Sequence, residues 1–236
     1  MTSVAPIAIL AGGLATRLRP LTETIPKSLI DINGQPFISH QLRLLKSAGL
    51  QQVVVCAGYL GEMIAEQTGN GSQFGLNVVY SFDGPRLLGT AGALRNARQH
   101  LGDAFQVIYG DSYLTCDYLA VQAAFARSGR KGLMTVYHNQ GHYDTSNIEF
   151  ADGQIVAYDK KNRTERMHHI DYGLGMLQTS VLEAIPDGQP CDLAELYADL
   201  LAQGQLAAFE VADRFYEIGS LAGIEETCNL LQKAPQ

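Results

Sequence analysis

The first half of the chain contains four short apolar runs that are typical of buried strands. They occupy residues 7–11, 53–57, 76–80 and 105–109, and glycine directly follows three of them. Continuous apolar runs of this length, bounded by glycine, are characteristic of strands buried on both faces of a sheet. We therefore expect strands at these four positions.

The segments between these runs have helical patterns. Within residues 38–48 the apolar positions fall on one face of a helix, and a glycine follows the last of them. Further helices are expected at 61–68 and 90–100, the second with Thr90 as its N-cap. Strands that alternate with helices at this spacing predict a parallel sheet with helices on both faces. The expected fold class is therefore α/β.

The second half of the chain has weaker signals. Two short runs, 147–150 and 154–158, flank Asp152-Gly153, which is the signature of a β-hairpin. The other elements expected here are a helix at 117–126, strands at 132–137, 172–177 and 206–209, and helices at 192–202 and 221–231. Because no linker, repeat or low-complexity tract separates the halves, we expect a single domain in which the second half forms an appended lobe.

Composition narrows the class of protein. The 236 residues include 17 Lys and Arg and 24 Asp and Glu, which gives a formal net charge of −7. This acidic balance argues against nucleic acid or a membrane surface as a partner, because both need a positive field on the protein. The N-terminus lacks the basic start of a signal peptide, and no apolar run is long enough to span a bilayer. We expect a cytoplasmic protein whose 4 separated cysteines are free thiols.

The strongest chemical signal lies directly after the first predicted strand. A strand that opens into Gly12-Gly13 exposes backbone N–H groups, which can bind phosphate oxygens. Three basic residues follow within the same loop: Arg17, Arg19 and Lys27. The adjacent glycines form neither the G-x-G-x-x-G of dinucleotide-binding proteins nor the Gly-Lys-Ser/Thr of P-loop proteins. The pattern therefore disfavours one alternative, a nicotinamide-dependent oxidoreductase, and predicts a local basic site for small phosphorylated ligands.

Residues 12–29 resemble a known signature. They match G-G-x-x-T-R-L-x-P-x-T-x-x-x-P-K-x-L, the pattern of the sugar-1-phosphate nucleotidyltransferases, at every fixed position. Four later segments resemble the family's motifs in the family's order: Leu88-Gly-Thr-Ala-Gly-Ala-Leu94, Gly110-Asp111, Asp159-Lys160 and Glu217-Ile-Gly-Ser220. The resemblance implies a Rossmann-like, mixed and mainly parallel sheet of the nucleotide-diphospho-sugar transferase type. It also implies one domain, 1–236, made of a nucleotide-binding core (1–137) and a sugar-binding lobe with a closing helix (138–236).

The resemblance also implies a reaction. A nucleoside triphosphate and a sugar 1-phosphate would give a nucleotide-sugar and pyrophosphate, by in-line attack of the sugar phosphate on the α-phosphorus. Arg17 would contact the triphosphate, and Lys27 would contact the reacting phosphates. The residues expected to bind the nucleotide are Leu10, Ala11, Gly12, Gly13, Gly89 and Thr90. In this interpretation Gly89 permits close approach of the nucleobase.

Mg²⁺ is the expected cofactor, held by two carboxylates. Asp111 follows a predicted buried strand, at the sheet edge where open α/β sheets bind ligands, and carboxylates together with phosphate oxygens suit this ion. Glu217 is the second expected ligand, and it stands where the family usually has aspartate. Glutamate keeps the charge but is one methylene longer.

On the sugar side the chain departs from the family pattern. Lys160 resembles the lysine that binds the sugar phosphate, although Asp159 precedes it where the family has glutamate. Asp171-Tyr172-Gly173 stands in place of the family's Asn-Ala-Gly. Asp171 would accept hydrogen bonds from sugar hydroxyls, and Gly173 would let the sugar approach the backbone. These differences suggest a distinct sugar preference.

The base and the sugar are the least determined features. Residues 88–94 most resemble the mannose- and manno-heptose-1-phosphate guanylyltransferases, so we expect GTP with D-glycero-D-manno-heptose 1-phosphate or mannose 1-phosphate. The alternatives are uridylyl, cytidylyl or thymidylyl transfer to another sugar 1-phosphate, and a non-catalytic module that binds nucleotide-sugars. Glu217 is the feature that favours such a module, whereas Arg17, Lys27 and Asp111 argue against it. The sequence indicates no oligomeric state.

Overall fold

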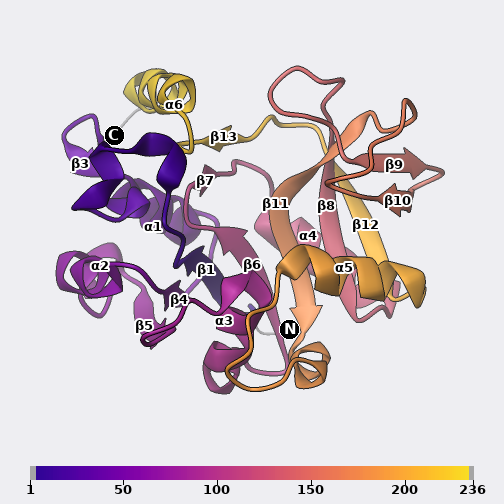
Figure 1. Ribbon diagram of the computed structural model, residues 1–236, viewed down its shortest axis with the longest axis horizontal. Helices are drawn as coiled ribbons and strands as arrows, with labels where there is room; N and C mark the ends of the chain where they lie inside the picture. Colours follow the sequence, from indigo (N-terminus) through magenta and orange to yellow (C-terminus); the bar gives the residue numbers. More distant parts are fainter. Residues whose placement is uncertain (1–3, 234–236) are drawn as a thin grey trace.

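A nine-stranded sheet with helices on both faces forms the centre of the computed structural model, which describes residues 4–233 (Figure 1). The strands run in the order β10-β9-β11-β6-β1-β4-β5, with β8 beside β11 and β12 beside β8. The strands are β1 (Ile7–Ala11), β4 (Gln52–Ala57), β5 (Asn77–Phe82), β6 (Ala104–Tyr109), β8 (Gly132–His138), β9 (Ile148–Ala151), β10 (Gln154–Tyr158), β11 (His169–Gln178) and β12 (Leu206–Val211). The helices are α1 (Phe37–Ser47), α2 (Gly61–Thr68), α3 (Gly89–Ala97), α4 (Tyr118–Ser128), α5 (Leu193–Ala202) and α6 (Leu221–Lys233).

The pairing confirms the expected fold class. β1 pairs in parallel with both β4 and β6, and β4 pairs in parallel with β5. β11 runs antiparallel to β6 and to β8, and β8 pairs in parallel with β12. The sheet is therefore mixed and mainly parallel at its centre, as the alternation of strands and helices predicts. The expected hairpin is present as β9 and β10, which pair antiparallel across Asp152-Gly153.

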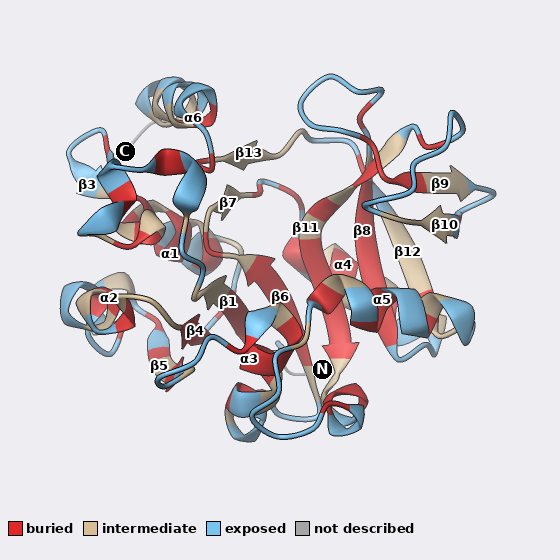
Figure 2. Cartoon of the chain, viewed as in Figure 1, coloured by how far each residue is buried: buried red, intermediate tan, exposed pale blue. Residues whose placement is uncertain are grey.

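Two hydrophobic clusters hold the helices to the sheet, one on each face. Leu42 of α1, Ile64 of α2 and Val121 of α4 belong to the first cluster, together with side chains of β1, β4 and β11. Leu94 of α3 and Leu196 of α5 belong to the second, together with side chains of β4, β6 and β8. The central strands are accordingly buried along most of their length, whereas the outer faces of the helices are exposed (Figure 2). Such burial is the main source of the stability of a fold of this kind.

The C-terminal segment returns to the first half of the chain. β13 (Tyr216–Glu217) pairs antiparallel with β7 (Ser112–Tyr113), and α6 packs beside the small β2–β3 ribbon (Asp31–Ile32 and Gln35–Pro36), as Figure 1 shows. Asn33 in this ribbon donates a hydrogen bond of 2.9 Å to the Cys228 carbonyl of α6. This return places Glu217 next to the end of β6. These two-residue strands could not be predicted from the sequence, because they are too short to show an alternation of apolar and polar residues.

Gly175 in β11 allows α5 to pack closely on the sheet. A Cβ at Gly175 would collide with the Tyr197 hydroxyl oxygen and would lie 3.3 Å from the Leu133 carbonyl oxygen. We expect Gly175→Ala to lower the free energy of unfolding by about 1–3 kcal/mol, as overpacking of a core does. Urea unfolding measures this loss. Adding Tyr197→Phe, which removes the colliding oxygen, should recover part of it, and a double variant with no recovery would contradict this explanation.

Two further features bear on the class of protein. Within residues 4–233 none of the helices is both long enough and apolar enough to cross a membrane. The cysteines are free, with Cys56 and Cys116 buried and Cys191 and Cys228 partly exposed. Burial raises the pKa of Cys56 to about 12 and that of Cys116 to about 12, so both are neutral, small core residues at physiological pH.

Candidate active site

A cavity of about 250 Å³ lies at the carboxyl ends of β1, β4 and β6. The predicted site residues that line it are Leu10, Ala11, Gly12, Gly13, Lys27, Gly89, Thr90 and Asp111. Parallel strands end at the same edge of the sheet, which explains why motifs far apart in the sequence meet here. Arg17 is not among the lining residues. It is exposed on a 3₁₀ turn, Thr16–Leu18, between the glycines and Lys27.

The two glycines after β1 have different surroundings. Gly12 lies against the loop after β4, where an added Cβ would lie 3.1 Å from the Gly58 nitrogen. Gly58 is equally confined, because its Cβ would lie 2.7 Å from the Gly12 carbonyl oxygen. A Cβ at Gly13 would have no neighbour within 4 Å, so packing does not require this glycine. Gly13 is exposed and lines the cavity, and a backbone turn at such a place can bind phosphate oxygens.

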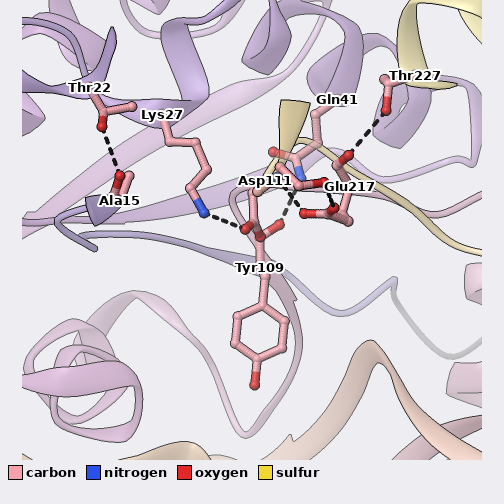
Figure 3. Close-up of polar contacts among 10 residues, drawn as sticks. Ala15, Thr22, Lys27, Gln41, Tyr109, Asp111, Glu217 and Thr227 are labelled. Atoms are coloured by element: carbon pink, nitrogen blue, oxygen red, sulfur yellow. Dashed lines mark hydrogen bonds and ion pairs between the residues drawn. The ribbon is translucent and has the colours of Figure 1, made fainter. Parts of the chain in front are cut away.

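Lys27 and Asp111 form an ion pair at the wall of the cavity. The Lys27 Nζ lies 2.7 Å from Asp111 Oδ2, and their side chains are 25% and 28% exposed (Figure 3). An ion pair in partial contact with water contributes at most about 1 kcal/mol to stability. Its main effect is therefore to fix an ammonium group and a carboxylate where they can meet a ligand.

Buried Gln41 of α1 fixes the turn that carries Asp111. Its Nε2 donates to the Tyr109 carbonyl at 3.0 Å and to the Ser112 carbonyl at 2.8 Å, on either side of the aspartate (Figure 3). A buried amide that donates to both carbonyl groups holds this turn in place. Sequence reasoning missed Gln41, because one polar residue in an otherwise amphipathic helix carries no distinctive signal.

Glu217 lies beside Asp111, as the resemblance implies. The Ile218 backbone N–H donates to the Asp111 carbonyl at 3.0 Å. The Glu217 carboxylate accepts from the Gly219 backbone N–H and, at 2.9 Å, from the Ser220 hydroxyl. A Cβ at Gly219 would touch Glu217 Oε2 and would lie 3.5 Å from Asp111 Oδ2, so both carboxylates border the same small space. Two carboxylates that converge in this way are a donor set that fits Mg²⁺, which completes its shell with phosphate oxygens and water.

Gly89 and Thr90 both line the cavity, and the structure corrects the capping role that was expected of Thr90. Gly89 begins α3 with φ +70, and a Cβ there would lie 2.6 Å from the Cys191 carbonyl oxygen, so contact with residue 191 already requires glycine. Thr90 is not the N-cap of α3. Its hydroxyl accepts from the Leu193 N–H at 2.6 Å and lies 3.3 Å from Asp192 Oδ1, so it supports the start of α5. Tertiary contact therefore replaces the expected local cap.

The residues predicted for the sugar gather around Tyr109. The Lys160 Nζ lies 6.0 Å from the centre of the Tyr109 ring, which itself lines the cavity. Asp171 Oδ1 accepts from the Gly173 N–H at 3.0 Å, and a Cβ at Gly173 would lie 3.6 Å from the Tyr109 ring. Burial raises the pKa of Asp171, and nearby Lys160 partly opposes that shift. These three residues thus extend the site beyond Tyr109.

Asp159 is placed differently. Its carboxylate accepts from the backbone N–H groups of Lys161 at 2.7 Å and Asn162 at 2.8 Å, which closes the turn after β10. These hydrogen bonds hold the pKa of Asp159 below its usual range. In this structure Asp159 shapes the loop that carries Lys160.

Asp83 is a site residue that sequence reasoning missed. It follows β5, lines the cavity, and accepts from the Leu88 N–H at 3.1 Å through Oδ2. Its Oδ1 is buried and has no hydrogen-bond partner among the described residues. Burial raises the pKa of this carboxyl group. An unpartnered carboxylate oxygen beside a cavity is a candidate ligand-binding group. The available signal was an acidic residue three positions after the strand predicted at 76–80, at the same sheet edge as Asp111.

Fold and site together define an α/β protein with a cavity at the carboxyl edge of its sheet, where a lysine and two carboxylates lie close together. The chain belongs to the nucleotidyl transferase family, whose model matches residues 7–226. Its relatives include sugar-1-phosphate nucleotidyltransferases that use different nucleotides.

Three curated relatives show this range. The N-acetylmuramate alpha-1-phosphate uridylyltransferase of Neisseria meningitidis is 41% identical, over 92% of this chain and 94% of its own length. The UTP–glucose-1-phosphate uridylyltransferase of Synechocystis is 30% identical, over 83% of this chain and 55% of its own length. The mannose-1-phosphate guanylyltransferase catalytic subunit beta of Xenopus tropicalis is 29% identical, over 89% and 60%. The chain thus spans little more than half of the latter two relatives.

Solved structures share the fold. A Bacillus anthracis protein crystallised with sucrose superimposes with a TM-score of 0.87 at 19% identity, covering 98% of this chain and 96% of that one. HddC from Yersinia pseudotuberculosis, crystallised with GMP-PN, superimposes with a TM-score of 0.79 at 24% identity, covering 97% and 100%. At these identities the likeness establishes the fold, and the fold class expected from the sequence is confirmed.

Proposed function

We propose that this chain transfers a nucleotidyl group from a nucleoside triphosphate to a sugar 1-phosphate and releases pyrophosphate. The observation that carries this proposal is the Lys27–Asp111 pair, 2.7 Å apart, at the wall of a cavity that also contains the backbone turn at Gly12-Gly13. Two phosphorylated reactants repel each other, so a site that joins them needs fixed positive groups and backbone donors between them. Family membership supports the same reaction class.

Each group of the site has a proposed task. The backbone of residues 10–13 binds the triphosphate, and Arg17, which is exposed on the 3₁₀ turn between the glycines and Lys27, contacts it when it is bound. Lys27 contacts the reacting phosphates and offsets the charge that develops as pyrophosphate leaves. Lys160 binds the sugar phosphate from the opposite side of Tyr109, while Asp171 and Gly173 contact the sugar. This assignment makes residues 1–137 the nucleotide-binding core and 138–236 the sugar-binding lobe of one domain, with Asp159 shaping the sugar-side loop.

A divalent cation, Mg²⁺, is part of the proposal. Asp111 and Glu217 border one small space, and their carboxylates are the residues that would hold it. When bound, such an ion neutralises negative charge on the phosphates. The hydrogen bonds from Gly219 and Ser220 hold the Glu217 carboxylate in place, so the extra methylene does not let it move away from the space that it shares with Asp111.

The nucleotide we propose is GTP, with a manno-configured sugar 1-phosphate. Asp83 supports guanine, because a carboxylate can accept from both N1–H and N2–H₂ on the edge of this base. UTP is the second candidate, and the Neisseria uridylyltransferase at 41% identity is the observation that favours it. Uracil offers one N–H between two carbonyl groups, so Asp83 could accept a single hydrogen bond from it.

Pyrophosphate release tests the reaction. GTP, UTP, CTP, ATP and dTTP are each combined with mannose, manno-heptose, glucose, N-acetylglucosamine and N-acetylmuramate 1-phosphates, with and without Mg²⁺. We expect turnover that depends on both substrates and on the metal ion. If nucleotides bind but no pair releases pyrophosphate, the chain is a nucleotide-sugar-binding module and the proposed function is wrong.

Asp83→Asn tests how the base is selected. We expect the variant to lose preference for GTP over UTP by about 10–100-fold, the usual discrimination of one bidentate contact to a base. The amide oxygen can keep the bond from Leu88, and its NH₂ group then faces the carbonyl groups of uracil. The measurement is the ratio of kcat/KM for the two nucleotides. A ratio that stays unchanged would show that Asp83 does not read the base.

A further inference from the structure

The region beyond Tyr109 is unusually acidic for a site that binds phosphorylated sugars. The Asp171 carboxylate interacts electrostatically with both the Lys160 ammonium and the Asp192 carboxylate. Burial keeps the pKa of the Tyr109 hydroxyl far above its usual value, and the Asp171 and Asp192 carboxylates raise it further. Two negative groups therefore stand beside one positive group.

The two acidic groups are fixed by the fold. Asp171 Oδ1 accepts from the Gly173 N–H at 3.0 Å, so the carboxylate is held against the chain of β11. Asp192 Oδ1 accepts from the Ala194 N–H at 2.8 Å, as the N-cap of α5, and lies 3.3 Å from the Thr90 hydroxyl. Neither group can move far from the space beyond Tyr109 without breaking these bonds.

The positive group has another task under the proposed function. Lys160 Nζ lies 6.0 Å from the centre of the Tyr109 ring and 5.9 Å from that of Tyr158. If it binds the sugar phosphate there, its charge is matched by the phosphate. What then remains around the sugar ring is the negative charge of Asp171 and Asp192.

We propose that Asp171 selects neutral, hydroxyl-rich sugar 1-phosphates and excludes sugars that carry a carboxylate. This inference rests on the proposed function and names the substrate class of its sugar side. Sugar hydroxyls donate to a carboxylate, and hydrogen bonds to a charged acceptor are among the strong ones. A carboxylate on the ring would instead face a like charge in a poorly hydrated space, which costs several kcal/mol.

The buried Tyr158 hydroxyl adds a second observation on the same side of Tyr109. It has no hydrogen-bond partner among the described residues, and Asp171 acts on it electrostatically. A phenol can donate to a sugar oxygen as well as accept from a sugar hydroxyl. A hydroxyl-rich ring could satisfy both this group and Asp171, whereas a carboxylate could satisfy only the phenol.

The consequence distinguishes this chain from its relative. N-acetylmuramate carries a carboxylate on its lactyl group, and the Neisseria relative is named for that substrate. The inference predicts that this chain discriminates against N-acetylmuramate 1-phosphate despite 41% identity to that enzyme. In the family pattern described above, asparagine stands at the position of Asp171, so a neutral residue is compatible with the family's fold.

Direct binding of two matched ligands tests the inference without requiring turnover. Mannose 1-phosphate and mannuronic acid 1-phosphate have the proposed configuration and differ only at C6, where one has CH₂OH and the other has a carboxylate. Titration calorimetry is performed with both, with and without Mg²⁺ and non-hydrolysable GTP or UTP analogues. We expect the protein to bind mannose 1-phosphate more tightly by about 100-fold, the factor that a like-charge contact of this size implies.

Asp171→Asn tests whether Asp171 causes the discrimination between the neutral and the acidic ligand. The amide keeps the shape of the side chain and can still accept from Gly173. We expect it to narrow the gap between the two ligands at least about tenfold, mainly by improving binding of the acid. Asp152→Asn is the matched control, because Asp152 is exposed at the hairpin turn, where its positive φ of 51 also suits asparagine. This control should leave the gap unchanged.

The outcomes separate this inference from the proposed function. Equal affinities for the two ligands, or a gap that Asp171→Asn leaves unchanged, would overturn the role of Asp171 while leaving the transfer reaction standing. Binding of neither ligand under any of these conditions would overturn both. If Asp171→Asn does not fold, the salt dependence of the wild-type protein provides the test. A difference in affinity between the two ligands that charge repulsion causes must shrink as the salt concentration is raised. A difference that shape causes must stay the same.

Discussion

Lys27→Met is expected to lower kcat/KM for nucleotidyl transfer by about 10²–10³-fold, the usual effect of removing one group that stabilises developing charge. Methionine keeps much of the length of the side chain and removes only its ammonium. The loss should appear mainly in kcat, because the proposed task of Lys27 is to offset charge as pyrophosphate leaves. Pyrophosphate release at saturating substrates measures it.

The folded state should change little in this variant. The Lys27–Asp111 pair is partly exposed, with side chains 25% and 28% accessible, so its loss costs at most about 1 kcal/mol. Lys131→Met is the matched control, because Lys131 is exposed between α4 and β8, away from the cavity. The control should keep full activity. A Lys27→Met variant with more than a tenth of normal turnover would contradict the role given to this residue.

The parts of the site that could be predicted from the sequence are those set by parallel strands. Continuous apolar runs that end at glycine located β1, β4 and β6 to within one residue. Since parallel strands end at one edge, residues that follow them, such as Gly12 and Asp111, had to meet. The position of Glu217 came from resemblance alone, because the two-residue strand that carries it shows no period.

What could not be predicted depends on contacts between distant segments. Thr90 was interpreted as an N-cap from its neighbours in sequence, yet its hydroxyl supports the start of α5, and Gly89 packs against the Cys191 carbonyl group. Nothing in residues 86–92 indicates that α5 will lie against them. Gln41 and Asp83 were missed for the same reason, since each gains its importance from a loop that another strand brings close. The local pattern of apolar and polar residues determines the helices and strands, whereas the tertiary arrangement decides which polar side chains face the cavity.

The two proposed metal ligands should differ in what their loss does. Asp111→Asn removes a carboxylate that borders the metal space and also pairs with Lys27, so it should lower kcat/KM by about 10²–10³-fold, equivalent to several kcal/mol of charge stabilisation. Glu217→Gln should lower it by a smaller factor, about 10–100-fold, as is usual when the groups that orient a metal site are altered. Both should raise the Mg²⁺ concentration needed for half-maximal rate.

Glu217→Asp separates charge from length at this position. It restores the residue that the family pattern has, but it draws the carboxylate back from the Gly219 and Ser220 donors. If charge at this point is what the metal site needs, Glu217→Asp should stay within about tenfold of the natural activity while Glu217→Gln falls further. Mn²⁺ binding followed by electron paramagnetic resonance gives a readout independent of turnover, and Glu225→Gln on the exposed face of α6 is the control. Unchanged Mn²⁺ affinity in both Asp111→Asn and Glu217→Gln would place the ion elsewhere, because two carboxylates that border one space cannot both be ligands and both be dispensable.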